Sequence, residues 1–195
     1  MTHWIFTLAF FGLVVSGVAI LLAHPRFYWG ETGGYGAASL FDLPLPLVLT
    51  GQTGWGRSLH FLCAWMAVLA GLVYAVSVVV TGHFGRQLLP APTRPRAAEE
   101  GAYNVLQQLT YLAVVFVVFP MAILTGLAMS PAIASVVPQA VTVWGGQQSA
   151  RTVHFFVADL LVLFLLVHLA MVIRAGFSSR MRAMITGRIA SKEPR

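Results

Sequence analysis

The stretch Ala150–Ile173, ARTVHFFVADLLVLFLLVHLAMVI, decides the class of protein to which this chain belongs. Its length suits a membrane helix, because a hydrocarbon core of about 30 Å requires roughly 20 apolar residues in helical form. Apart from the histidines, its only ionisable side chains are those of Arg151 and Asp159. The stretch therefore predicts a transmembrane helix.

Three further apolar runs, 3–23, 57–80 and 103–129, predict three more spans. Of the 195 residues, 58% are hydrophobic and 9% are charged, and the mean hydropathy is +0.80. A soluble domain carries about a quarter charged residues, so a water-soluble fold is excluded. The first run lacks a basic leader, and we interpret it as a retained span rather than a signal peptide. We predict an all-α membrane protein: one domain, residues 1–195, forming a bundle of four transmembrane helices.

Basic residues outside the spans predict the orientation of the bundle. Loop 26–55 and the helix starts beside it carry only Arg26, Arg57 and Arg151, whereas the linker 82–102 and the tail 174–195 are rich in arginine. By the positive-inside rule, the linker, the tail and both termini lie in the cytoplasm. Loop 26–55 then faces the outer, periplasmic side of the bacterial inner membrane. The basic residues on the cytoplasmic side are Arg86, Arg94, Arg96, Arg174, Arg180, Arg182, Arg188, Lys192 and Arg195.

Histidines inside membrane spans point to function by default. His154 and His168 differ by about 40° around the fourth helix and by roughly 21 Å along it, so one helix face presents two imidazoles at two depths. His60 lies near the outer end of the second helix, level with His154, and His3 lies at the inner end of the first, level with His168. A b-type haem iron is held by two axial side chains. The pattern predicts two haems b, one held by His60 with His154 and one by His3 with His168.

The remaining histidines are interpreted as interfacial. His24 stands beside Pro25 at a helix end, and His83 is out of phase with His60, although His83 is the alternative ligand if His3 is not one. Arg57 and Arg151 each precede a proposed ligand by three residues and so share its helix face. They suit the haem propionates, which need cationic partners. The alternative is that both arginines simply anchor helix ends at the interface.

Several other residues have two interpretations. Asp159 points away from the proposed haem face, which favours contact with another helix, a partner or a second copy over a proton relay. The glycines Gly12, Gly17, Gly71 and Gly126 suit either close haem approach or helix packing. Cys63, the only cysteine, excludes an internal disulfide and is expected to pack as a small apolar residue.

With these residues placed, the chain resembles the bacterial di-haem cytochrome b family, which includes the membrane subunits of thiosulfate reductase, formate dehydrogenase and nickel-iron hydrogenase. The resemblance covers nearly the whole chain. Its motifs are His3-Trp4 with Ser16-Gly17, Tyr103-Asn104 with Gln107, Thr125-Gly126, the segment Gly145–Phe155, and Met184–Gly187. The last two are most similar to a branch that accompanies molybdopterin-dependent oxidoreductases. Family members usually carry more residues before the first histidine, so we expect His3 to lie in a frayed first turn.

The resemblance implies an electron conduit linked to membrane quinone. Quinone would bind near the inner haem, at the level of Tyr103, Asn104 and Gln107, whose side chains can exchange hydrogen bonds with its oxygens. These residues could equally mark a helix start. Loop 26–55 and the segment 138–148 would dock a periplasmic molybdoenzyme partner. Two alternatives stay open: a stand-alone oxidase that passes electrons from superoxide to quinone, and a membrane anchor that binds no haem.

Overall fold

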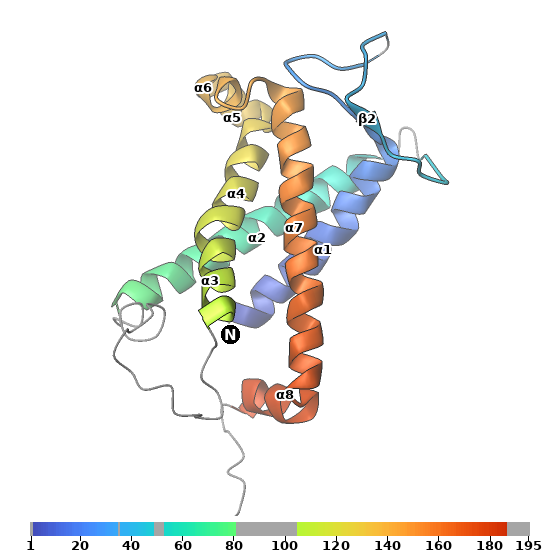
Figure 1. The fold of residues 1–195 in the computed structure, drawn as a ribbon. Coiled ribbons are helices and arrows are strands. Elements are labelled where there is room, and N and C mark those ends of the chain that lie inside the picture. The colour runs from blue at the N-terminus through green and yellow to red at the C-terminus, as the bar shows by residue number, and fades with distance from the viewer. Residues whose placement is uncertain (1, 35, 49–52, 81–104, 187–195) are drawn as a thin grey trace, which may run out of the picture.

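The computed structural model describes residues 2–34, 36–48, 53–80 and 105–186 (Figure 1). Within these residues four helical segments are long and apolar enough to cross a membrane. They are α1 (Thr2–Ala23), α2 (Thr53–Val80), the composite segment Leu109–Ala128, and α7 (Gln147–Arg174). The predicted all-α fold with four membrane helices is confirmed, with α2 and α7 each starting a turn earlier than expected. The linker 82–102 lies outside the described residues.

The third span is built from α3 (Val105–Ala113), a π-helical segment η2 (Val114–Val118) and α4 (Phe119–Ala128). Pro120 explains the change of helix type. Proline lacks a backbone N–H, and its ring collides with the carbonyl four residues earlier in an ordinary α-helix. Here the N–H of Phe119 donates to the carbonyl of Val114, five residues back, and Pro120 falls in the first turn of α4. The widened turn accommodates the proline without ending the span.

The helices pack as two hairpins, α1 against α2 and α4 against α7 (Figure 1). Small residues line the contact within the first hairpin, where Ala9, Ser16 and Ala19 of α1 are buried. Gly12 lies directly over Cys63 of α2, and any side chain at position 12 would collide with the cysteine sulfur. Small residues let membrane helices approach closely. Gly12 is therefore explained by helix packing, and Cys63 is buried as expected.

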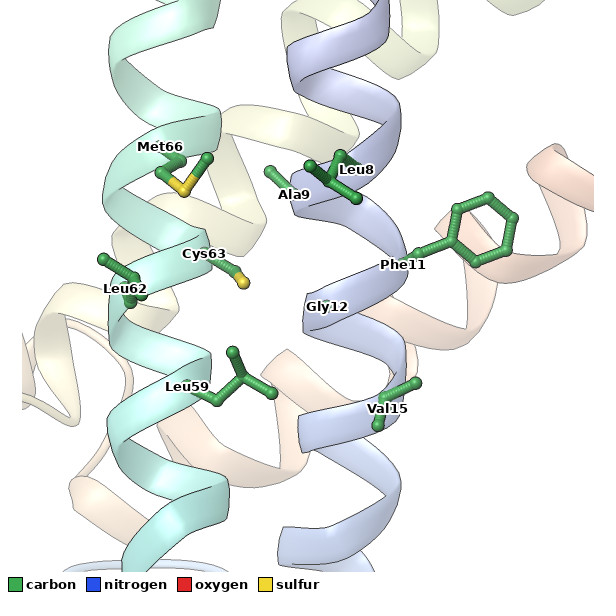
Figure 2. A pocket seen from close by; sticks show the side chains of 9 residues that line it. All are labelled: Leu8, Ala9, Phe11, Gly12, Val15, Leu59, Leu62, Cys63 and Met66. Carbon is green, nitrogen blue, oxygen red and sulfur yellow. The ribbon is translucent and has the colours of Figure 1, made fainter.

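Large apolar side chains face outward, as the surface of a membrane protein requires. Val79 and Val80, for example, are 76% and 78% exposed. An apolar groove of about 410 Å³ runs between α1 and α2, with Leu8, Phe11, Val15, Leu62 and Met66 among its lining residues (Figure 2). The contrast between exposed large apolar residues and buried small ones is the reverse of a soluble core.

The two ends of the bundle differ in what covers them (Figure 1). One end, called here the loop end, carries a two-stranded antiparallel sheet of β1 (Arg26–Phe27) and β2 (Phe41–Asp42), together with α5 (Pro131–Val136) and α6 (Gln139–Thr142). The other end, called the tail end, carries the start of α1 and the amphipathic helix α8 (Phe177–Thr186). These short elements were not predicted from the sequence.

Candidate functional site

Two histidines from different hairpins face each other near the loop end. His60 lies on α2 and His154 on α7, and their ring centroids are 6.2 Å apart with the ring planes at 68°. Both side chains are half-buried. We call His60 and His154 the loop-end pair. The structure thus brings together two residues that the sequence analysis paired across 94 positions of chain (154 minus 60).

Each imidazole of the loop-end pair contacts a buried hydroxyl through Nδ1. Ser16 Oγ of α1 lies 3.0 Å from Nδ1 of His60, and Thr125 Oγ1 of α4 lies 2.9 Å from Nδ1 of His154. Both hydroxyl residues are 0% exposed. From the sequence, Gly17 and Gly126 were assigned to haem approach or helix packing, whereas Ser16 and Thr125 had no assigned role. The signal was available in the sequence, because a hydroxyl residue followed by glycine lies in the apolar interior of one span of each hairpin, at Ser16-Gly17 and at Thr125-Gly126.

The glycines that follow these hydroxyls also lie against the imidazoles. A Cβ added at Gly17 would lie 3.9 Å from Cε1 of His60, and one at Gly126 would lie 3.5 Å from Cε1 of His154. These are ordinary contact distances, so the two glycines border the rings. Gly71 has open space around it. Of the four glycines singled out in the sequence, Gly17 and Gly126 are the two beside the candidate site.

The tail end holds the second pair, His3 and His168. Nδ1 of His168 lies 3.1 Å from the hydroxyl of Tyr111 on α3, and its ring stacks on Phe164 with centroids 5.9 Å apart. His3 lies in the first turn of α1 with an exposed side chain, and its Nδ1 is 3.3 Å from Thr7 Oγ1. This pair is the more open of the two.

The loop-end pair fits an iron with two axial imidazoles. Transition metals bind imidazole nitrogen at about 2 Å, so two rings that share one ion have centres separated by about 6 Å. The observed 6.2 Å agrees with that value. Nε2 of each ring is available to a metal, because Nδ1 of each histidine is hydrogen-bonded to a hydroxyl. Neutral imidazoles whose second nitrogen is hydrogen-bonded are the usual form of histidine ligands.

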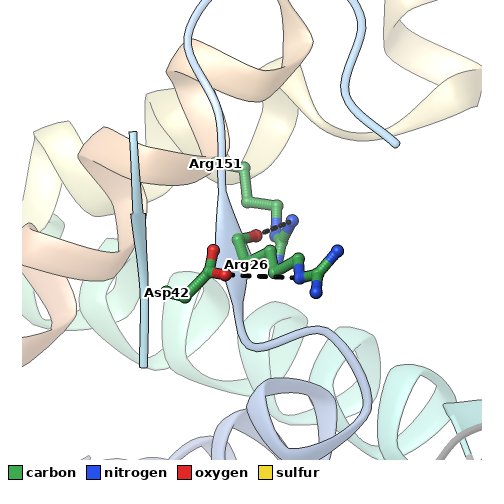
Figure 3. Close-up of polar contacts among 3 residues, drawn as sticks. All are labelled: Arg26, Asp42 and Arg151. Atoms are coloured by element: carbon green, nitrogen blue, oxygen red, sulfur yellow. Dashed lines mark hydrogen bonds and ion pairs between the residues drawn. The ribbon is translucent and has the colours of Figure 1, made fainter. Parts of the chain in front are cut away.

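Two arginines, Arg57 and Arg151, lie near His24 at the loop end, and each precedes a histidine of the loop-end pair by three residues. The guanidinium of Arg151 donates to the main-chain carbonyl of Arg26 at 3.1 Å (Figure 3). It also donates to the main-chain carbonyl of His24. Burial, together with the positive charges of Arg151 and Arg57, lowers the pKa of His24. His24 is therefore neutral at neutral pH, and the net charge of this cluster comes from Arg57 and Arg151. The sequence analysis did not connect His24 with these two arginines.

The loop between α1 and α2 is fastened to the first turns of α7. Gly30 donates its N–H to Ser149 Oγ at 2.7 Å, and its carbonyl accepts the N–H of Gln148 at 2.9 Å. Thr152 Oγ1 donates to the carbonyl of Tyr28 at 2.8 Å. Helix starts leave four N–H groups without partners, and here the Gly30 carbonyl accepts two of them, from Gln148 and, at 3.3 Å, from Ser149. Gly146, with φ of 120°, allows this approach because a side chain there would collide with the backbone of Gly30.

An aromatic cluster completes the attachment of the loop. Phe27 of β1 is 1% exposed. Its ring stacks on Phe41 of β2 at 4.7 Å, contacts Phe155 of α7 at 4.5 Å, and lies under the guanidinium of Arg151 at 4.9 Å. Arg26 and Asp42 form an ion pair of 3.4 Å on the outside of the sheet (Figure 3). Strand β2 thus packs on α7 through Phe41, whose ring centroid lies 6.2 Å from that of Phe155.

Replacing Arg151 with alanine is expected to loosen this loop. The variant loses two hydrogen bonds from a charged group and the contact with Phe27. Together these contacts contribute about 2 kcal/mol to the free energy that holds the loop on α7. Limited proteolysis between residues 26 and 48 is then expected to speed up by roughly thirtyfold. Arg57→Ala is the matched control, because no contact between Arg57 and the loop backbone is seen among the described residues. Equal cleavage rates in the two variants would contradict the anchoring role.

The residues expected near a quinone are described only in part. Tyr103 and Asn104 lie outside the described residues, as does His83. Gln107 lies in the first turn of α3, one turn from Tyr111, and its Nε2 contacts Met171 Sδ of α7 at 3.8 Å. Gln107 is therefore at the level of His168. Asp159 is exposed on α7, and among the described residues it has no hydrogen bond or ion pair.

Four membrane helices that bring histidines of different helices face to face are the arrangement expected of a membrane cytochrome b, because helix bundles build cofactor sites from side chains on facing helices. The chain belongs to the family described as prokaryotic cytochrome b561, whose sequence model matches residues 1–187. The resemblance to a bacterial cytochrome b family is thus confirmed, and membership implies haem b as the cofactor of an integral membrane protein.

One curated relative is a protein of Azospira oryzae named "Putative protein-methionine-sulfoxide reductase subunit YedZ1". It is 29% identical to this chain over 185 residues, which cover 88% of this chain and 86% of the relative. No solved structure matches.

Proposed function

We propose that this chain is a di-haem cytochrome b subunit that carries electrons between an oxidoreductase at its loop end and quinone at its tail end. The observation that carries the proposal is the loop-end pair, with ring centroids 6.2 Å apart and each Nδ1 on a buried hydroxyl. The residues that would hold the two haem irons are His60 with His154, and His3 with His168. Haem b supplies reversible one-electron redox chemistry when bound.

The protein surroundings support a haem at the loop end. Arg57 and Arg151 place positive charge at the outer margin of the loop-end pair, where cationic side chains suit carboxylate groups of a macrocycle. Arg151 shares its donors with the loop backbone, so it would link the loop to the cofactor. Loop position and cofactor occupancy are then coupled through one side chain.

The proposed partner is a molybdopterin-dependent oxidoreductase that docks on the loop end from the periplasm. The relative from Azospira oryzae is named as a subunit of a protein-methionine-sulfoxide reductase, which supports a partner of that kind. The loop end also exposes large apolar side chains, among them Trp29 at 61%, Val136 at 79% and Val143 at 78%. Such residues suit burial against another protein.

The contacts at the loop end favour this function over a stand-alone oxidase of superoxide. A positively charged funnel for superoxide would need Arg26, Arg57 and Arg151 directed to solvent. Arg26 is paired with Asp42, and Arg151 is turned to main-chain carbonyls and Phe27. The third possibility, an anchor without haem, conflicts with the two hydroxyl-bonded histidines that face each other.

Co-purification tests the partner. An affinity-tagged chain, extracted in mild detergent from membranes of the organism that encodes it, is expected to carry molybdenum in a second polypeptide. The Arg151→Ala variant is expected to carry less. A chain that purifies alone and still passes electrons from superoxide to a quinone would instead establish the stand-alone oxidase.

Replacing Gln107 with leucine tests the proposed quinone end. We expect quinol to reduce the haem of this variant about tenfold more slowly, because one lost hydrogen bond to the substrate corresponds to about 1.4 kcal/mol. Stopped-flow absorbance of the haem bands with a short-chain quinol measures the rate. Gln139→Leu, in α6 at the opposite end, is the matched control. A wild-type rate for Gln107→Leu, or equal slowing in both variants, would argue against this location.

A further inference from the structure

The two buried hydroxyls at the loop-end pair have restricted hydrogen-bonding roles. Ser16 Oγ lies 2.6 Å from the carbonyl oxygen of Gly12, and Thr125 Oγ1 lies 2.6 Å from the carbonyl oxygen of Met121. A carbonyl can only accept, and a serine or threonine hydroxyl has one hydrogen to give. Each hydroxyl therefore donates to the carbonyl four residues back in its own helix. Toward the histidine it can act only as an acceptor.

The protonation of the histidines follows from this assignment. His60 Nδ1 is 3.0 Å from Ser16 Oγ, and His154 Nδ1 is 2.9 Å from Thr125 Oγ1. Because both hydroxyls accept, both Nδ1 atoms carry the proton. In a neutral imidazole only one nitrogen is protonated, so Nε2 of each ring keeps its lone pair. The structure thus specifies one tautomer for both rings, and it is the form that can bind a metal through Nε2.

The arrangement occurs twice, once in each hairpin. In the first hairpin, Ser16 and Gly17 of α1 border the ring of His60 on α2; in the second, Thr125 and Gly126 of α4 border the ring of His154 on α7. In both, the histidine follows an arginine by three positions. Two independent copies of the same contact make accidental proximity of hydroxyl and ring an unsatisfactory explanation.

We infer that Ser16 and Thr125 are positioning residues that lock His60 and His154 in the Nδ1-protonated tautomer and set how strongly each Nε2 donates to iron. The tautomer follows from the hydrogen bonds alone, whereas the effect on iron rests on the proposed function. A neutral hydroxyl polarises the Nδ1–H bond less than a carboxylate does, so the ligands stay close to neutral imidazole. Removing the acceptor weakens donation to iron and favours the ferrous state.

Three variants test the inference. Ser16→Ala and Thr125→Val remove the hydroxyls with little change in side-chain volume, whereas Thr125→Ser keeps a hydroxyl at position 125. In redox titrations of Ser16→Ala and Thr125→Val, the midpoint potential of the loop-end haem is expected to rise by up to about 59 mV. This shift corresponds to a tenfold change in the one-electron equilibrium constant. Thr125→Ser is expected to match the wild-type potential. Ser77→Ala is the matched control, because Ser77 makes the same bond to a carbonyl four residues back, Val73, far from the loop-end pair along α2.

The outcomes separate the inference from the proposed function. Nitrogen NMR of the haem-free chain, labelled in histidine, reports the tautomers directly: protons on Nδ1 of His60 and His154 support the inference, and protons on Nε2 overturn it. Unchanged potentials and ferric EPR spectra in both hydroxyl variants also overturn it. If haem is lost from Thr125→Val, retention by Thr125→Ser supports the role of the hydroxyl, and loss from both overturns it. A wild-type chain without haem refutes the proposed function while leaving the tautomer test intact.

Discussion

Replacing His154 with alanine is expected to leave one haem b per chain where the wild-type protein holds two. The variant removes one of two facing imidazoles, and His60 has no other histidine in ring contact among the described residues. An iron with a single protein ligand loses most of its binding free energy, since each metal ligand and its supporting partner matter for affinity. Pyridine haemochrome absorbance against quantitative amino-acid analysis measures the loss, and redox titration should then show a single component.

His24→Ala is the matched control for this variant. His24 lies at the same end of the bundle, near Arg151 and Arg57, but no ring contact between His24 and another histidine is seen among the described residues. We expect the control to keep both haems. Two haems in His154→Ala, or one in both variants, would refute the assignment of the loop-end ligands.

Replacing His168 with alanine is expected to remove the other haem and to leave the loop-end haem unchanged. The His168 ring is held by the Tyr111 hydroxyl at 3.1 Å and by stacking on Phe164, and these contacts fix its orientation for the proposed ligand role. The redox titrations of His168→Ala and His154→Ala should therefore be complementary, and their sum should reproduce the wild-type curve.

The partner of His168 is decided by a second comparison. We expect His3→Ala to lose the same haem as His168→Ala and His83→Ala to keep both. His3 is exposed in the first turn of α1, so its haem is expected to dissociate more readily on dilution than the loop-end haem. Loss in His83→Ala with retention in His3→Ala would transfer the ligand role to His83.

Much of the fold followed from the sequence because the bilayer imposes a simple rule. A helix needs about 20 apolar residues, and the four runs ended at polar or proline residues close to the observed helix ends. The phase of His154 and His168 on one helix face likewise needs only the helical repeat. The level of His60 with His154 followed from topology, because each histidine lies about two turns from the start of its helix, and both helices start at the loop end.

The parts that were missed depend on contacts between distant segments. The docking of Gly30 on the start of α7 involves backbone groups of Gly30, so no pattern of side chains in the sequence predicts it. The strand pair Phe27 and Phe41 is too short to leave an alternating pattern. Arg151 was expected at a haem propionate, but its observed contacts are the carbonyls of the loop, which sequence spacing alone does not reveal.

The π-helical turn and the hydroxyl contacts could be predicted from the sequence only in part. Pro120 within an apolar run signals a local defect, although not its type. Ser16 and Thr125 each precede a glycine inside a membrane span, and such polar residues usually bond a neighbouring helix or their own backbone. Only the structure shows that they do both at once, and that histidines are the partners.

The most direct test of the account is the amount of haem b per polypeptide in the detergent-purified wild-type chain, from pyridine haemochrome absorbance and quantitative amino-acid analysis. We predict two haems per chain, one held by the loop-end pair and one held by His3 with His168. A colourless protein would contradict it altogether, and a single haem would contradict the pair at the tail end.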